Sequence, residues 1–283
     1  MIPTQHRSQN MNRWHGAPAF TLIEMLVVVS TVGLLMALLV PALTSARSQA
    51  HGLVCRANLR QLTLAGLGYA TENNGAFVPA ASDMFDDAGR HRWHGVRDRL
   101  DEPFEPARGP LAAYLAEGRT NECPIRVAFT RAQDWDANFE RGCGGYGYNM
   151  TYLGSRLWDP TPATIEGFQR AYTHTATLQE IAQPAETLMF ADTAMATGPD
   201  TLIEYSFAEA PFAVFGGVLK SDFYMSPSLH FRHRGSVNIA WADGHAGARP
   251  RADLDRLNAY GAASWTMELG WPAPVDNSLF DLE

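Results

Sequence analysis

The stretch Phe20–Pro41 has the sequence FTLIEMLVVVSTVGLLMALLVP, and it decides how the chain must be built. It holds a single formal charge, Glu24, near its start. At 1.5 Å rise per residue, a helix over this stretch covers about 30 Å, which is the thickness of the hydrocarbon core of a bilayer. A soluble helix rarely stays apolar on every side for that distance. The stretch therefore predicts a transmembrane helix.

Glu24 separates this stretch from a generic membrane anchor. An unpaired carboxylate is costly in lipid, so a glutamate inside a membrane span is by default a functional residue. The alternative is an interfacial glutamate whose side chain reaches water at the membrane surface.

The sequence FTLIE at Phe20–Glu24, with a polar leader before it and an apolar run after it, resembles the processing signal of type IV pilins and type II secretion pseudopilins. The resemblance implies that a prepilin peptidase cuts between Ala19 and Phe20 and that the new amino terminus of Phe20 is methylated. Glu24 then becomes the fifth residue of the mature chain. Pro41 falls where pilins commonly carry a helix-kinking proline.

Ala19 departs from the family pattern, in which glycine usually precedes the cut. A cut after Gly16 would make Glu24 the eighth residue, so cleavage between Ala19 and Phe20 fits the pattern better. The competing interpretation is a secretory signal peptide cut after Ala46, but the apolar run exceeds the roughly 7 to 15 residues of such a peptide. We therefore expect residues 1–19 to be a leader.

A helical pattern continues after Pro41. Apolar residues share one face at a 3.6-residue period, while Arg56 and Arg60 project elsewhere. The members of this face are Leu43, Ala46, Ala50, Leu53, Val54, Ala57, Leu64 and Ala65. We expect residues 20–41 to be the transmembrane half of one long helix and residues 42–70 to be an amphipathic half on which a globular body packs.

Residues 71–283 predict an antiparallel-sheet ectodomain with long loops. Thr187–Ala191 is a short apolar strand that ends at Asp192. Near the C-terminus, Val237, Ile239 and Trp241 alternate with Asn238, Ala240 and Ala242, which predicts a strand with one apolar face. Turn signals flank this strand at Arg234-Gly235 and Asp243-Gly244, so Ser228–Ala248 predicts a β-meander.

His233, nine intervening residues and Asp243-Gly244 match the H-X9-DG pattern of a domain found in prepilin-like proteins. Together with the leader signature, the resemblance implies an α+β, pilin-like fold with a hairpin at residues 233–244. The implied function is that of a pseudopilin-like structural subunit of a type II secretion or type IV pilus-like filament, and not of an enzyme.

The same resemblance implies partners and a location. The partners are a prepilin peptidase, other pilin-like subunits, and an inner-membrane assembly platform with its ATPase. The location is the bacterial inner membrane, crossed once, with the C-terminal body in the periplasm or outside the cell. In assembly, we expect Glu24 to pair with the amino terminus of Phe20 of a neighbouring subunit, because pairing removes the penalty of isolated charges in lipid.

A membrane-tethered metal-dependent enzyme is the first alternative. His230, His233, Asp243 and His245 are close in sequence, and such sets bind zinc or iron. Strand alternation cannot put all four on the same face. We therefore expect Asp243 to cap the turn before Gly244, and His233 to bond to backbone or to Asp243 across the hairpin.

A surface adhesin or sugar-binding ectodomain is the second alternative, which the loop aromatics Trp93, Trp135 and Trp158 would permit. Calcium is the one cofactor that the resemblance brings in, because some major pseudopilins bind it in their C-terminal loops. Asp192, Asp222 and Asp243 are the weak candidates for oxygen ligands, and none lies in a D-x-D-x-D-G loop. Otherwise we expect no cofactor.

The 283 residues are 46% apolar and 18% charged, with a formal net charge of −8, which argues against nucleic acid as the main partner. The stretch Arg90–Arg99 is expected to be a solvated loop. Cys55 belongs to the helix and is expected to pack as a small apolar residue. Cys123 and Cys143 lie in Pro/Gly-rich surroundings, and outside the cytoplasm they could form a disulfide; two free thiols are the alternative.

Overall fold

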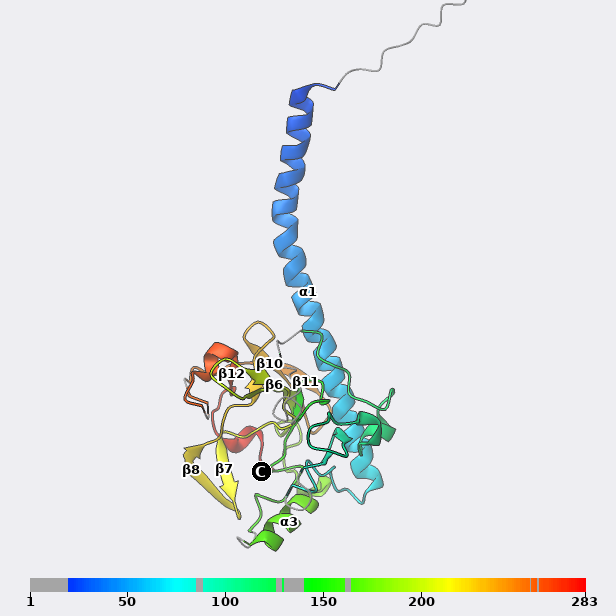
Figure 1. The fold of residues 1–283 in the computed structure, drawn as a ribbon, viewed down its shortest axis with the longest axis vertical. Helices are drawn as coiled ribbons and strands as arrows, with labels where there is room; N and C mark the ends of the chain where they lie inside the picture. The colour runs from blue at the N-terminus through cyan, green and yellow to red at the C-terminus, as the bar shows by residue number, and fades with distance from the viewer. Residues whose placement is uncertain are drawn as a thin grey trace, which may run out of the picture. The chain divides into compact units, whose positions relative to one another are not determined.

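The computed structural model describes residues 20–84, 89–125, 129, 140–160, 164–254, 256–258 and 260–283. The chain divides into two compact units, residues 1–47 and residues 48–283. Helix α1 (Leu22–Glu72) belongs to the first unit up to Arg47 and to the second from Ser48 (Figure 1). The expected leader, residues 1–19, lies outside the described residues, and so does Ala19 of the expected cleavage site.

In the first unit, α1 is exposed on every side. The large apolar side chains from Phe20 to Leu43 are between 43% and 83% exposed. By length and composition the helix can cross a membrane, and none of its most apolar window is buried. This bears out the coarse expectation of a long apolar N-terminal helix.

The second unit is built around a four-stranded antiparallel sheet in the order β11-β10-β4-β3. Its strands are β3 (Tyr146–Tyr148), β4 (Leu188–Asp192), β10 (Ser236–Trp241) and β11 (Ala246–Pro250). Every residue of β4 is buried, and so is all of β10 after Ser236. The two central strands are therefore covered on both faces, whereas alternation in the sequence predicts only one buried face for β10.

Four two-stranded ribbons surround this sheet. They pair β1 (His91–Arg92) with β2 (Gly95–Val96), β5 (Met195–Ala196) with β6 (Leu202–Ile203), β7 (Phe212–Phe215) with β8 (Val218–Tyr224), and β9 (Leu229–His230) with β12 (Leu269–Gly270). A second α-helix, α3 (Ile165–Thr173), begins at Thr164, whose side chain accepts a hydrogen bond from the backbone of Gly167. The other described residues form loops and short 3₁₀ turns, so the described part of the chain is α+β with antiparallel sheets, as expected.

The predicted β-meander is formed only in part. The strands β10 and β11 are joined by the turn at Asp243-Gly244, where Gly244 has φ +93°. A positive φ of this kind favours glycine, which explains the turn signal. The strand β9 pairs with β12 and not with β10. The ladder of β9 thus depends on a segment about forty residues away, which local sequence does not reveal.

The buried face of α1 in the second unit differs from the predicted one. It consists of Cys55, Asn58, Leu59, Leu62, Thr63, Ala65, Gly66 and Ala70. Leu53, Val54 and Leu64 of the predicted face are about half exposed or more. The sheet comes close to the helix at Gly66, where a Cβ atom would collide with the end of the Met189 side chain in β4. The buried residues still follow the helical period, but they lie on a neighbouring face that includes this glycine.

Candidate functional site

Four side chains that can bind a metal ion meet in the second unit. They are Cys55 of α1, Cys123 of a loop, Asp192 at the end of β4 and His233 in the turn before β10. One donor atom from each lies within 4.8 Å of the others. Cys55 and Asp192 are fully buried, His233 is buried and Cys123 is partly buried. We call these four residues the cysteine–histidine cluster.

Local structure explains how each member reaches the cluster. Cys55 is one turn before Leu59 on the buried face of α1. The backbone N–H of Cys123 donates to the carbonyl of Gly144 at 3.1 Å, which holds its loop beside the start of β3. His233 precedes Arg234 and Gly235, which both have positive φ. This tight turn places the imidazole of His233 beside the start of β10.

The hydrogen bonds within the cluster converge on one nitrogen. Nε2 of His233 lies 3.2 Å from Oδ2 of Asp192 and 3.6 Å from Sγ of Cys123. A Cys-His-Asp catalytic relay uses the two ring nitrogens separately, one for the nucleophile and one for the carboxylate. Here Nδ1 of His233 has no hydrogen-bond partner among the described residues. The cluster is therefore not arranged as a nucleophilic triad.

The environment shifts the pKa values of the cluster. A hydrogen bond from Cys55, followed by one from His233, lowers the pKa of Cys123 to about 5 against the effect of burial. Burial would lower the pKa of His233, but hydrogen bonds to Asp192 and Cys123 raise it to about 9. The hydrogen bond to Cys123 and burial raise the pKa of Cys55. These two pKa shifts favour a thiolate at Cys123 and an imidazolium at His233 at neutral pH.

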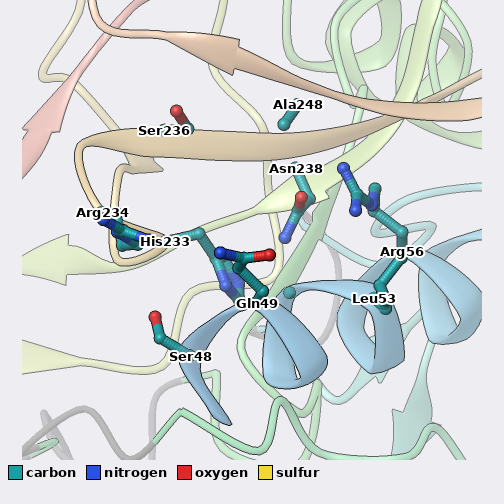
Figure 2. A pocket seen from close by; sticks show the side chains of 10 residues that line it. Ser48, Gln49, Leu53, Arg56, His233, Arg234, Ser236, Asn238 and Ala248 are labelled. Carbon is teal, nitrogen blue, oxygen red and sulfur yellow. The ribbon is translucent and has the colours of Figure 1, made fainter. Parts of the chain in front are cut away.

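A cleft of about 300 Å³ opens beside the cluster, between α1 and the sheet. Ser48, Gln49, Gly52, Leu53 and Arg56 line it from the helix, and His233 and Asn238 are the buried residues on the other side. Figure 2 shows the side chains of His233 and Asn238 directed toward α1. The Nδ2 atom of Asn238 has no hydrogen-bond partner within the described part of the chain. Buried polar side chains therefore lie against the inner wall of the cleft.

Of the two partners expected for His233, Asp243 is wrong, because the two residues lie at opposite ends of β10. The backbone of His233 pairs with that of Ser236, and its imidazole lies against Asp192. The expected cap is confirmed: Oδ1 of Asp243 accepts a hydrogen bond from the backbone N–H of His245 at 3.0 Å and lies 2.6 Å from Nδ1 of that histidine. The imidazole of His245 stacks on Trp241, with ring centroids 4.2 Å apart.

The histidine set considered for a metal-dependent enzyme does not come together. His230 is buried, and its Nδ1 accepts a hydrogen bond from Nε of Arg232 at 3.0 Å. Burial, with the nearby charge of Arg232, lowers the pKa of His230 to about 2. His245 is exposed in the turn. Among the described residues, only His233 of the four expected ligands belongs to the cysteine–histidine cluster.

The three aspartates considered for calcium are separated as well. Asp222 is exposed on β8, and Asp243 is exposed in the turn after β10. Asp192 alone lies in the cysteine–histidine cluster, where its neighbours are thiols and an imidazole. These are poor partners for calcium, which takes oxygen ligands.

The disulfide considered between Cys123 and Cys143 is not formed, and the alternative of free cysteines holds, also for Cys55. The side chain of Cys123 turns toward Cys55 and His233. Cys143 is fully buried, with Sγ 3.8 Å from Oε2 of Glu204. Sequence analysis missed Cys55 and Cys123 as site residues. Two cysteines and a histidine are residue types that bind zinc, and that composition is a signal in the sequence. These three residues are far apart in the chain, however, and only the fold makes them neighbours.

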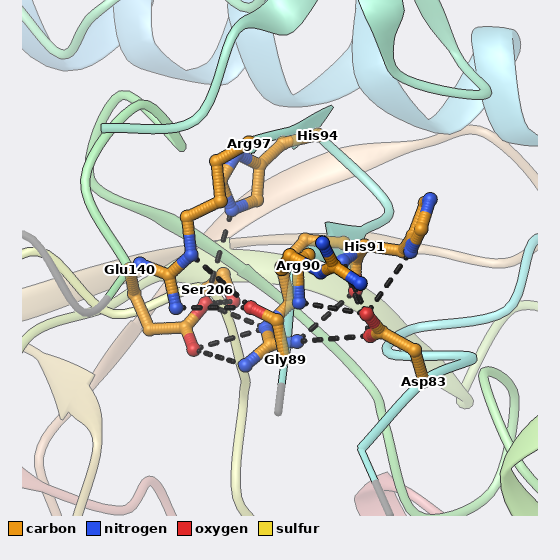
Figure 3. Close-up of polar contacts among 9 residues, drawn as sticks. Asp83, Gly89, Arg90, His91, His94, Arg97, Glu140 and Ser206 are labelled. Carbon is orange, nitrogen blue, oxygen red and sulfur yellow. Dashed lines mark hydrogen bonds and ion pairs between the residues drawn. The ribbon is translucent and has the colours of Figure 1, made fainter. Parts of the chain in front are cut away.

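The stretch Arg90–Arg99 is not a solvated loop. Arg92 and Arg97 are buried, and Arg92 donates from Nε and Nη2 to the carboxylate of the fully buried Glu140 at 2.9 to 3.0 Å. Figure 3 shows this carboxylate of Glu140 beside Ser206. The hydroxyl of Ser206 also donates to this carboxylate. Burial would raise the pKa of Glu140, but Arg92 and its hydrogen bonds hold that pKa below the ordinary value. We call Arg92, Glu140 and Ser206 the arginine–glutamate cluster.

The two tryptophans that the structure describes, Trp93 and Trp158, do not form the binding surface considered for an adhesin. Trp93 is fully buried, and its Nε1 donates to the carbonyl of Ser206 at 2.7 Å. Trp158 is partly buried beneath the guanidinium of Arg156, 5.3 Å from the ring centroid. Trp135 lies outside the described residues.

Three expected processing and assembly residues lie in the first unit. Phe20 precedes α1, Glu24 lies in its first turn, and Pro41 lies within it. The carboxylate of Glu24 accepts hydrogen bonds from N and Oγ1 of Thr21, both at 2.8 Å, and its own N–H donates to Oγ1 of Thr21 at 3.2 Å. This reciprocal pair is a capping box, which starts the helix. Glu24 thus has a role within its own chain that sequence analysis did not consider.

No family model, curated protein or solved structure matches this chain. Its function must be inferred from its own sequence and geometry.

Proposed function

We propose that the protein is a pseudopilin-like structural subunit of a type II secretion or type IV pilus-like filament. The prepilin peptidase cuts it before Phe20, and residues 20–41 hold it in the bacterial inner membrane until assembly. The observation that carries this proposal is α1. One helix of 51 residues is apolar and exposed on every side over its first half and buried on one face over its second half.

A helix with such a first half requires an apolar environment on all sides. Exposed apolar patches of this size are rare on soluble monomers. A bilayer covers the surface before assembly, and apolar helices of neighbouring subunits can cover the same surface in a filament. The second half of α1 meanwhile carries the globular body, so one element serves as both anchor and filament core.

In this proposal, Glu24 sets how neighbouring subunits align. After cleavage, the amine of Phe20 is a cation at the membrane surface or in lipid. A neighbouring Glu24 can pair with it, which removes the penalty of two isolated charges and fixes one axial register between subunits. The capping box leaves room for this contact, because a carboxylate has several lone pairs and can accept further hydrogen bonds.

The first test is the mass of the protein extracted from membranes of a host that contains a prepilin peptidase. We expect a chain that begins at N-methylated Phe20, and the unprocessed chain in a host without the peptidase. The Ala19→Gly variant should increase the processed fraction, because glycine usually precedes the cut. An intact Met1 in the peptidase-containing host, or a start at Arg47, would contradict the proposal.

The second test separates the two roles of Glu24. Glu24→Gln removes the charge that pairs with the amine, and Thr21→Val removes the capping partner but keeps the carboxylate. We expect Glu24→Gln to reduce filament assembly at least tenfold, measured by crosslinking in membranes and by sheared filaments, while Thr21→Val assembles nearly as the parent does. Equal losses in both variants would show that Glu24 acts only as a helix cap.

A further inference from the structure

We propose that Cys55, Cys123, Asp192 and His233 bind one zinc ion in a structural site that ties α1 to the sheet. This inference goes beyond the proposed function and does not depend on it. The site takes its two sulfur ligands from segments that sequence analysis did not connect. It also differs from the histidine set and the aspartate set that the sequence suggested for a metal ion, because neither of those sets includes a cysteine.

The spacing of the donor atoms fits a tetrahedral ion. Zinc binds sulfur at about 2.3 Å and nitrogen or oxygen at about 2.0 to 2.2 Å, which sets the edges of the tetrahedron at about 3.3 to 3.8 Å. The His233–Asp192 edge is 3.2 Å and the Cys123–His233 edge is 3.6 Å. All four donor atoms lie within 4.8 Å of one another. Side-chain movements of less than about 1 Å would complete the tetrahedron.

The donor types select the metal. Two thiolates and an imidazole suit zinc, whereas calcium and magnesium require oxygen ligands. Four protein ligands also close the coordination sphere. A catalytic zinc keeps a position open for water or substrate, so a closed set indicates a structural ion.

Charge and hydrogen bonding at Asp192 give independent support. This carboxylate is fully buried, and its Oδ1 has no hydrogen-bond partner among the described residues. Its Oδ2 accepts a hydrogen bond from the backbone N–H of Asn238 at 2.9 Å. The imidazole of His233 contacts Oδ2 of this carboxylate and also contacts Cys123, so Oδ1 stays buried without a partner among the described residues, which is costly. A zinc ion placed among the four donors removes this cost.

The surroundings also orient the ligands as around known metal sites. The hydroxyl of Tyr146 donates to Sγ of Cys55 at 3.4 Å, and Asn58 in turn donates to that hydroxyl at 3.1 Å. Such outer contacts fix ligand orientation. Nδ1 of His233 is buried beside Gly52 and has no hydrogen-bond partner among the described residues. The ion then joins a helix, a loop, the end of β4 and the turn before β10.

Metal content of the full chain, purified in detergent with a tag free of histidine, tests the proposal. We expect one zinc per chain in the wild type. Cys55→Ser, Cys123→Ser, Asp192→Asn and His233→Gln should each lose stoichiometric zinc. The matched controls are Cys143→Ser, a buried cysteine outside the site, and His245→Gln, a histidine of the same hairpin; both should keep it.

Cobalt provides a readout that a folding defect cannot imitate. Chelator-stripped wild type that is still folded by circular dichroism should take up one Co²⁺. It should show the visible bands of tetrahedral cobalt with thiolate-to-metal charge transfer, and the charge-transfer intensity should fall by about half when one of two thiolates is replaced. The proposal is overturned if the folded, stripped wild type binds neither zinc nor cobalt, if it carries iron instead, or if the four ligand variants keep one zinc.

Discussion

Two clusters of buried charge lie in the second unit, and they differ in how the charge is balanced. In the arginine–glutamate cluster, the guanidinium of Arg92 faces the carboxylate of Glu140 with both groups fully buried. Each charge has its own counterion, and Ser206 adds a hydrogen bond. In the cysteine–histidine cluster, a carboxylate and a thiolate share one imidazolium.

The difference shows how to distinguish a structural ion pair from a metal site within one protein. The first cluster satisfies its charges through side chains supplied by the chain itself, so it requires nothing else. The second leaves Oδ1 of the buried Asp192 without a hydrogen-bond partner in the part of the chain that the structure describes, and it places two thiols and an imidazole around this carboxylate. Burial alone does not separate the two clusters, but the balance of donors and acceptors does.

The largest effect is expected when one of the two charged side chains of the arginine–glutamate cluster is replaced. Arg92→Met leaves the carboxylate of Glu140 buried without its counterion, which should lower the free energy of unfolding by about 3 to 5 kcal/mol. Urea denaturation of the detergent-solubilised chain measures this loss. The Arg92→Met/Glu140→Gln double variant removes both charges and should recover most of it. A double variant as unstable as the single one would show that packing, not charge balance, dominates.

The second largest effect is expected when the proposed zinc ion is removed from the cysteine–histidine cluster. If zinc is present at a hundredfold excess over its Kd, its removal by a chelator should lower the free energy of unfolding by about 2.7 kcal/mol. Thermal unfolding with and without chelator measures the change. His233→Gln should not respond to the chelator, and Arg92→Met should respond as the wild type does. A chelator effect that survives in His233→Gln would place the metal elsewhere.

The smallest effect is expected at the far end of β10, outside both clusters. Asp243→Ala removes the hydrogen bond to the backbone of His245 and should cost about 1 kcal/mol in the free energy of unfolding. It should leave the zinc content unchanged, because Asp243 and His233 lie at opposite ends of the strand. Loss of zinc in Asp243→Ala would show that the turn after β10 affects the cysteine–histidine cluster at the other end of the strand, and would contradict this prediction.

The sequence by itself determined the features that depend on neighbouring residues. The apolar composition of Phe20–Pro41 predicted the exposed first half of α1, and the helical pattern after Pro41 predicted its continuation. The short apolar run before Asp192 predicted β4. Val237, Ile239 and Trp241 are buried in β10 as expected, and the turn forms at Asp243-Gly244. These elements follow from helical rise, strand alternation and the φ that glycine permits, all of which act within a few residues.

The tertiary structure alone decided which residues meet. The face of α1 that packs on the body includes Gly66 beside Met189 of β4, and Leu53 and Leu64 lie outside it and are exposed. A glutamate far along the chain made Arg92 a buried residue, although its neighbours indicated a solvated loop. Cys123 lies beside Cys55 and His233 and not bonded to Cys143, because packing brings a loop, a helix and a turn together. Such long-range contacts depend on the free energy of the whole folded domain, which no local sequence pattern encodes.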